Sequence, residues 1–310
     1  MAGMNDTITP AMKRLTIGTY TIELAPDFGT NTFHGISHLD CTVDGAISTV
    51  ELHAVDIEIS RFRFSGVDAA SIDVRSESQI IYATAASPLS GNVELEMEFT
   101  GILNDLLVGF YRSRMGNDVC AASQFEERDA RRAFPCIDHP GRKSIFHISL
   151  VAPAGMTAIS NTGVTSIDEL SDGKRRYRFA PTPPMPTYLL FFGVAPYEII
   201  EDASYRIPIR VATTQGCAES GRKAIEYAGK SIEFFESYTG VEYPLDKLDL
   251  LGVEDFAYGA MENFGAITYR ESYLYFDDET SSQADLESVA GVTAHEVAHM
   301  WFGDLVSPAD

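Results

Sequence analysis

Two histidines and a glutamate form the pattern in this sequence that most directly indicates chemistry. Residues 295–299 read HEVAH, so His295 and His299 are four positions apart. In a helix that spacing places both imidazoles on one face, where they can take two corners of a tetrahedral zinc site. Glu296 then lies beside the first ligand, where its carboxylate can take a proton from a zinc-bound water. The pattern predicts a zinc hydrolase.

A second segment, residues 259–263 of sequence GAMEN, precedes these histidines. By itself it is a glycine turn with one acid. Together with the HEVAH segment, and with NFGAITYRE at 263–271 and WFGD at 301–304, it resembles the gluzincin zinc aminopeptidases. That family includes the alanyl and leucyl aminopeptidases and the leukotriene hydrolase. The resemblance extends over nearly the whole chain.

The resemblance implies that two acids recognise the amine of the substrate. An exopeptidase must hold a free α-ammonium group and reject internal peptide bonds, which a fixed carboxylate does through a charge-assisted hydrogen bond. In the family, the glutamate that matches Glu262 has that role, and Glu126 matches a second anchor. The stretch around Gln124 and Glu126 resembles the part of the β domain that closes over the active site, which implies that Gln124 lines the first substrate pocket.

The other residues of the GAMEN segment would bind the peptide. The backbone of Gly259 and Ala260 would pair with the substrate as an added strand. Met261 would share the wall of the first pocket with Gln124, and Asn263 completes the motif.

Two histidines do not complete a catalytic zinc site, which has three protein ligands and an open position. By the resemblance, the third ligand is a glutamate that would fall beyond Asp310, and so would the tyrosine that stabilises the oxyanion. We therefore expect one zinc ion per full-length chain. In the 310-residue chain we expect zinc to bind weakly or not at all, and we expect no activity.

The elements before residue 201 read as strands. Period-two alternation of apolar and polar residues is typical of antiparallel sheets with one solvated face. We expect residues 1–201 to form an N-terminal all-β domain, a sandwich or saddle of stacked sheets. The expected strands are residues 20–24, 50–59, 92–99 and 188–192, with turn residues at 26–27, 44–45, 90–92 and 172–173.

From residue 202 onward, helical and strand patterns alternate. We expect residues 202–310 to form the N-terminal part of a thermolysin-like α/β catalytic domain, which the end of the chain leaves incomplete. The expected elements are a helix over 219–238 that Gly240 ends, strands at 248–253 and 267–270, and a helix from Ser282, capped by Asp285, to about Phe302.

Composition limits the classes of partner. The net charge is −22, from 45 acidic and 23 basic residues, which argues against nucleic acid or an anionic membrane as a partner. About 45% of the residues are apolar, enough for buried cores, and no run reaches the roughly 18 apolar residues of a membrane span. The four cysteines form no CxxC pair and read as reduced thiols, which predicts a cytoplasmic protein.

The sequence therefore predicts a zinc-dependent aminopeptidase that acts on peptides with a free N-terminus. Two alternatives stay open: a non-catalytic peptide-binding relative, and an epoxide hydrolase of the leukotriene hydrolase type. At 138–140 the chain reads DHP, with His139 where many family members have glutamate. The tricorn-interacting aminopeptidase factors of archaea are similar at this point. Side-chain specificity and oligomeric state are not specified.

Overall fold

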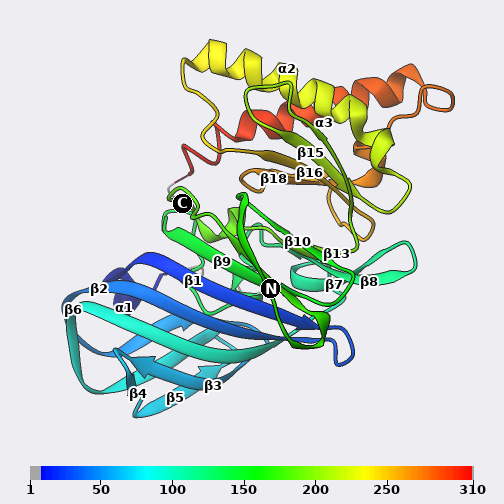
Figure 1. Cartoon of the computed structure of the whole chain (residues 1–310). Helices are drawn as coiled ribbons and strands as arrows, with labels where there is room; N and C mark the ends of the chain where they lie inside the picture. The colour runs from blue at the N-terminus through cyan, green and yellow to red at the C-terminus, as the bar shows by residue number, and fades with distance from the viewer. Residues whose placement is uncertain (1–7, 309–310) are drawn as a thin grey trace.

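The chain folds into a region built of sheets and a region in which helices cover a sheet (Figure 1). The structure is a computed structural model, and it describes residues 8–308. A short helix, α1 (Pro10–Lys13), precedes the first strand. The expected succession of a mostly β region and a mixed α/β region is confirmed.

The first sheet follows the strand order β11-β12-β9-β1-β2-β6-β3-β4, with β5 pairing beside β6. Its long strands β2 and β6 are antiparallel and alternate as the sequence predicts: Leu39 pairs with Leu95 on the buried face, and Asp40 pairs with Glu94 on the exposed face. The strands are β1 (Leu15–Asp27), β2 (Thr32–His53), β3 (Ile57–Phe64), β4 (Val67–Asp68), β5 (Ser71–Arg75), β6 (Ile80–Ile102), β9 (Ile145–Ala152), β11 (Val164–Glu169) and β12 (Arg175–Phe179).

A second sheet, of order β10-β13-β8-β7, lies between the first sheet and the helical region (Figure 1). Its strand β8 ends at Gln124, so the chain leaves this sheet toward Glu126. The strands are β7 (Gly109–Met115), β8 (Asp118–Gln124), β10 (Thr157–Ser160) and β13 (Phe192–Ala195).

The third sheet has the order β14-β15-β16-β18-β17, and helices α2 and α3 lie on its face remote from the other sheets (Figure 1). Strands β15, β16 and β18 are parallel, whereas β14 and β17 are antiparallel to their neighbours. The elements are β14 (Glu198–Asp202), β15 (Ile209–Thr213), α2 (Arg222–Thr239), β16 (Leu248–Val253), β17 (Ala260–Met261), β18 (Ala266–Arg270) and α3 (Gln283–His299). Short 3-10 turns are η1 (Ala130–Arg132), η2 (Ser171–Gly173), η3 (Thr187–Leu189), η4 (Ala218–Gly221) and η5 (Glu271–Tyr273).

Local sequence explains where the two long helices begin and end. Ser282 caps α3 and forms the expected capping box with Asp285, each side chain accepting a backbone N–H of the other residue. Gly240 ends α2 in the left-handed conformation, with φ of 70°. The buried residues of α3 are Val289, Thr293, Glu296 and Val297, so the inner stripe of this helix includes the glutamate of the HEVAH segment.

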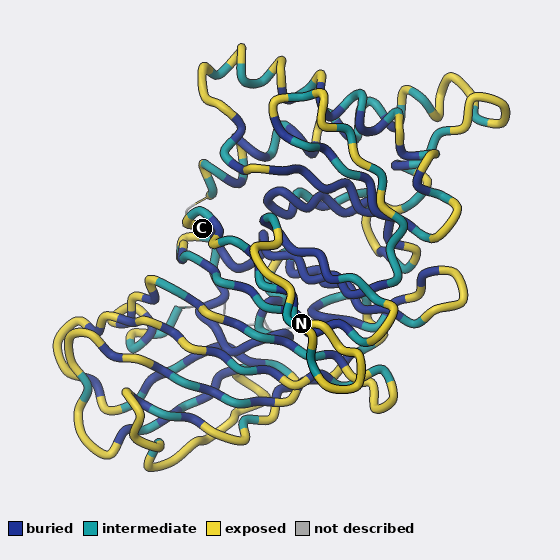
Figure 2. The backbone as a smooth tube through the Cα atoms, viewed as in Figure 1, coloured by how far each residue is buried: buried dark blue, intermediate teal, exposed yellow. Residues whose placement is uncertain are grey.

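The buried apolar side chains of both regions form one large, continuous cluster. Figure 2 shows these buried segments running through the strands of the sheets and up to the inner sides of the helices. The two regions therefore pack against each other over an apolar interface, which fixes how residues from one face residues from the other. None of the described helices combines the length and apolar character that crossing a membrane would need.

Several boundaries differ from the sequence-based expectations. The predicted strand 50–59 is interrupted, because Asp56 adopts a positive φ of 55° between β2 and β3. Gly45 and Gly91, also at positive φ, bend β2 and β6 without ending them, since the two strands pair on both sides of the bend. Helix α3 ends at His299 rather than near Phe302.

The segment that leads into the mixed region also differs. Residues 188–192, predicted as a strand, form η3 and only then enter β13. The predicted domain boundary at residue 201 falls within β14, which pairs with β15 of the third sheet. We propose that the boundary lies at residues 196–197, between β13 and β14.

Candidate active site

Helix α3 brings two imidazoles together at its C-terminal end. Nε2 of His295 and Nε2 of His299 are 3.2 Å apart, and the rings meet edge to face. Nδ1 of His299 lies 3.0 Å from the carbonyl oxygen of Phe302. Because a carbonyl only accepts, Nδ1 carries the proton and Nε2 keeps its lone pair. The turn that follows the helix thus holds His299 in the tautomer that a metal ligand needs.

The spacing of these two nitrogens fits a zinc ion. With zinc–nitrogen bonds of about 2.0–2.1 Å, two corners of a tetrahedron lie roughly 3.3–3.4 Å apart. The two Nε2 atoms, at 3.2 Å, nearly match that separation. Gly303 leaves room for the ring of His299, because a Cβ at residue 303 would lie 2.9 Å from Nδ1. The spacing of His295 and His299 is therefore one that two ligands of a single metal ion could have.

Two carboxylates lie close to His299. Glu262, Glu296 and His299 each place a potential ligand atom within 4.8 Å of the others, and Oε1 of Glu262 is 3.9 Å from Nδ1 of His299. Burial, followed by the charges of Glu262 and Glu126, raises the pKa of Glu296 to about 8. A pKa this close to neutrality is in the range that suits a group which takes up and releases a proton during catalysis.

Glu126 and Glu262 reach this place from different sheets. Glu262 follows β17 directly, and Glu126 comes two residues after the end of β8, beyond the fully buried Phe125. Burial raises the pKa of Glu126, the charges of Glu262 and Glu127 raise it further, and His299 lowers it. A cation placed near Glu126 and Glu262 would favour the charged form of Glu126.

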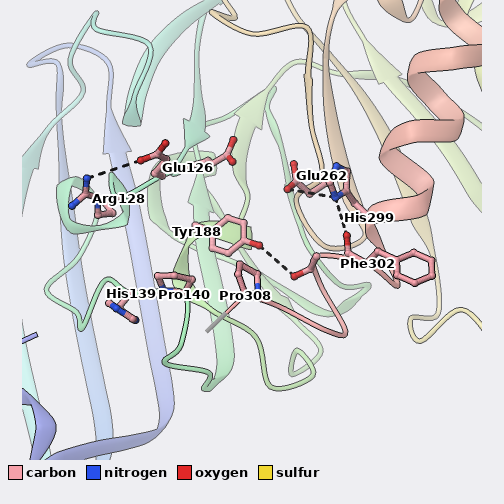
Figure 3. Close-up of a pocket in the computed structure, with 11 residues that line it drawn as sticks. Glu126, Arg128, His139, Pro140, Tyr188, Glu262, His299, Phe302 and Pro308 are labelled. Atoms are coloured by element: carbon pink, nitrogen blue, oxygen red, sulfur yellow. Dashed lines mark hydrogen bonds and ion pairs between the residues drawn. The ribbon is translucent and has the colours of Figure 1, made fainter. Parts of the chain in front are cut away.

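A cavity of about 490 Å³ connects these side chains. Figure 3 shows Glu262 beside His299 on one side, Glu126 and His139 on the other, and Tyr188 between them. The hydroxyl of Tyr188 donates to the carbonyl oxygen of Gly303, at 3.3 Å. The wall comprises Glu126, Glu127, Arg128, His139, Pro140, Tyr188, Glu262, His299, Phe302, Gly303 and Pro308.

Comparison with known proteins places this arrangement in a family. Residues 18–189 match the peptidase M1 N-terminal domain, and residues 223–310 match the peptidase family M1 domain. The chain belongs to the peptidase M1 family. The resemblance to zinc aminopeptidases that the sequence motifs indicate is thereby confirmed at the level of the family.

Curated M1 relatives cover almost the whole chain. Aminopeptidase 2, mitochondrial, of Saccharomyces cerevisiae is 39% identical over 301 residues, which are 93% of this chain and 31% of the relative. The alanine/arginine aminopeptidase of the same yeast is 38% identical over 301 residues, 93% of this chain and 35% of the relative. Probable aminopeptidase 1 of Saccharolobus solfataricus is 38% identical over 286 residues, 92% of this chain and 35% of the relative. The chain spans about a third of the length of these relatives.

The M1 chain brings some of the predicted site residues to the cavity and leaves others outside its wall. Glu126, Glu262 and His299 line the cavity. His295 is exposed beside His299, whereas Glu296 is buried. Gly259 and Ala260 lie half-buried at the edge strand β17. The predicted pocket residues that are buried and do not line the cavity are Gln124, Met261 and Asn263.

Gln124 is the most unusual of these buried residues in the M1 chain. It is fully buried at the end of β8, and neither its amide nitrogen nor its oxygen has a hydrogen-bond partner among the described residues. Asn263 is better satisfied, because its Nδ2 donates to Oγ1 of Thr268 at 3.2 Å. A buried amide with unused donors and acceptor is rare in folded proteins.

Sequence reasoning missed several residues of the cavity wall of the M1 chain, among them Tyr188 and His139. Tyr188 belongs to an apolar run that predicts a strand, and only the turn η3 directs its ring toward the cavity. His139 is not predicted as a site residue from the sequence, yet it lines the cavity. The one signal that could have identified it is the DHP segment, where the chain departs from the usual family pattern.

Proposed function

We propose that the whole protein is a zinc-dependent aminopeptidase that releases N-terminal residues from peptides. The observation that carries this proposal is that Glu126 and Glu262, from two different sheets, border one cavity beside His299. A zinc peptidase that cleaves internal bonds has no need of acids there. A free α-ammonium group is the cation that such a pair would bind through charge-assisted hydrogen bonds.

Strand β17 supports binding of an extended peptide. It is the last strand in the order of the third sheet, so the backbone of Gly259 and Ala260 is at an edge to which a further strand can add. A peptide paired there would have its amine next to Glu262, which follows β17. Gln124, Met261 and Asn263 stay proposed pocket residues, and the unpartnered amide of Gln124 is the main support for that role.

Glu296 is the proposed general base. His295 and His299 would hold the zinc ion, which when bound polarises a carbonyl group and acidifies water. The carboxylate of Glu296 would take the proton of the attacking water and pass it to the leaving amine. We propose that a third ligand from outside these 310 residues completes the metal site. The 310-residue chain would then bind zinc weakly and turn over no substrate.

Amine recognition is the step to test first, in the full-length protein. We expect hydrolysis of alanine p-nitroanilide and none of its N-acetylated form. Glu262→Gln should lower kcat/KM on the free-amine substrate by roughly 10- to 100-fold, the range expected when a hydrogen bond to a charged group is lost. Glu127→Gln is the matched control, because Glu127 is at the same cavity but its side chain is 82% exposed. Equal hydrolysis of the acetylated and free substrates would contradict the proposal.

A further inference from the structure

A buried lysine joins the two regions of the molecule behind the cavity. Lys247, directly before β16, is 4% exposed. Its Nζ donates to the carbonyl oxygen of Ser160 at 2.8 Å, to that of Gly265 at 2.7 Å and to Oδ2 of Asp249 at 2.7 Å. The three protons of the ammonium group are thus all used. Ser160 belongs to the second sheet, and Gly265 belongs to the turn that follows Glu262.

A buried asparagine makes a second junction next to the first. Nδ2 of Asn161 donates to the carbonyl oxygen of Leu189 at 2.7 Å and to that of Phe264 at 2.9 Å. Its Oδ1 accepts the backbone N–H of Phe191 at 2.9 Å. We call Lys247 and Asn161, with the carbonyl groups that they bind, the latch.

Burying the charged groups of the latch costs free energy. This argues that the latch fixes an arrangement of residues rather than adding stability. Burial lowers the pKa of Lys247 to about 8, although Asp249 partly offsets this. Asp249 is fully buried and also accepts two hydrogen bonds from Arg210, at 2.6 and 2.7 Å. Buried ion pairs of this kind contribute little stability compared with apolar packing, but a fully satisfied network specifies one arrangement of its members.

The latch is connected through the backbone to both acids of the cavity, Glu126 and Glu262. Asn161 directly follows β10, and β10, β13 and β8 are neighbours in the second sheet, with Glu126 just beyond β8. On the other side, the latch binds the carbonyl groups of Phe264 and Gly265, two and three residues after Glu262. The amide of Phe264 also donates to the carbonyl oxygen of Leu189, at 3.2 Å. The turn that carries Glu262 is therefore attached to the sheet that carries Glu126.

We propose that Lys247 and Asn161 are positioning residues that set Glu262 relative to Glu126 for binding the α-ammonium group of a peptide. This inference rests on the proposed aminopeptidase function. Neither residue lines the cavity, so the latch acts through the segments that it binds, chiefly the turn at residues 262–265.

The test uses Lys247→Met in the 310-residue chain. Methionine keeps much of the apolar stem, and Asp249 keeps its two bonds to Arg210, so the variant should fold. Asn161→Ala removes the other half of the latch and is measured alongside it. Thr182→Val is the matched control: Oγ1 of Thr182 accepts the backbone N–H of Phe146 at 3.0 Å, a buried bond within the β region that has no link to Glu262.

Two measurements distinguish a positioning role of the latch from a general loss of stability in the variants. Hydrogen exchange at the amides of Phe264 and Ala266 should speed up in both latch variants and stay unchanged within α3 and in Thr182→Val. By calorimetry, the preference of the chain for the tripeptide Ala-Ala-Ala over its N-acetylated form should fall roughly five- to tenfold, a change that corresponds to a misaligned charge-assisted bond.

The possible failures are distinguishable. A wild-type chain that binds both peptides equally would overturn the anchoring role of Glu262, and with it both the proposed function and the latch. A wild-type preference for the free amine that survives intact in Lys247→Met and Asn161→Ala would overturn the latch alone. Unchanged exchange at residues 264 and 266 in both variants would also overturn it.

Discussion

The two sides of the cavity are held in place in different ways. On one side, helix α3 sets His295, Glu296 and His299 by the local geometry of consecutive turns, and the capping box at Ser282 fixes where that helix begins. On the other side, Glu126 reaches the cavity because β8 ends within a sheet that it shares with β13 and β10, which come from distant parts of the chain. The metal-binding part of the site is thus local, whereas the amine-binding part depends on tertiary packing.

This difference separates two kinds of damage. A substitution near α3 should change metal binding and leave the β region intact. A disturbance of the β region should instead move the acids and leave the imidazole pair unchanged. Each of the following predictions applies one of these disturbances, and zinc affinity is measured in the full-length protein.

The largest effect is expected from His299→Ala. Removing one of the two histidine ligands should lower the affinity for zinc more than about 100-fold, since even the loss of an outer-shell partner costs about 10- to 100-fold. Competition with a chromophoric chelator measures this. His139→Ala is the control, because His139 lines the same cavity on the side away from His299 (Figure 3). Equal losses in both variants would mean that metal binding is not local to α3.

A smaller effect is expected from Gly303→Ala. Residue 303 has a φ of +144°, and a Cβ there would lie 2.9 Å from Nδ1 of His299. We expect a loss of about 1–3 kcal/mol in the free energy of unfolding, and zinc affinity should fall because His299 must move. Gly291→Ala, within α3 and with nothing within 4 Å of the added Cβ, should instead stabilise by about 0.5–1 kcal/mol. Urea denaturation that finds the two variants equal would contradict this.

We expect acid to destabilise the β region of the molecule through protonation of His53. Burial, followed by the charges of Arg131, His139 and Arg128, lowers the pKa of His53 to about 3, and its Nδ1 accepts the backbone N–H of Asp138 at 3.1 Å. The folded pKa is below the unfolded value of about 6.5, so the unfolded state binds the extra proton. The contribution of His53 to the free energy of unfolding is therefore complete above about pH 6.5. It falls as the pH drops toward 3, by about 2 kcal/mol at pH 5.

The measurement for His53 is urea unfolding at pH 7 and pH 5. His53→Asn keeps an acceptor for the amide of Asp138 but has no titrating ring, so its stability should change less between the two values. An equal decrease in wild type and variant would assign the acid sensitivity to other groups.

The same contrast explains what sequence could predict. The α3 residues and the strand at residues 248–253 follow from spacing and alternation, which are local properties. The position of Tyr188 in the cavity wall and the full burial of Gln124 depend on how distant strands meet, and no pattern of neighbouring residues contains that information. The bends at Gly45 and Gly91 carry turn signals, but pairing between β2 and β6 continues past them.

The most direct test of the account is the turnover of Glu296→Gln in the full-length protein. If Glu296 is the general base beside a zinc held by His295 and His299, kcat on alanine p-nitroanilide should fall about 10²- to 10⁴-fold. Bound zinc should stay at the wild-type level, because the amide replaces no metal ligand. Wild-type turnover in this variant would contradict the account.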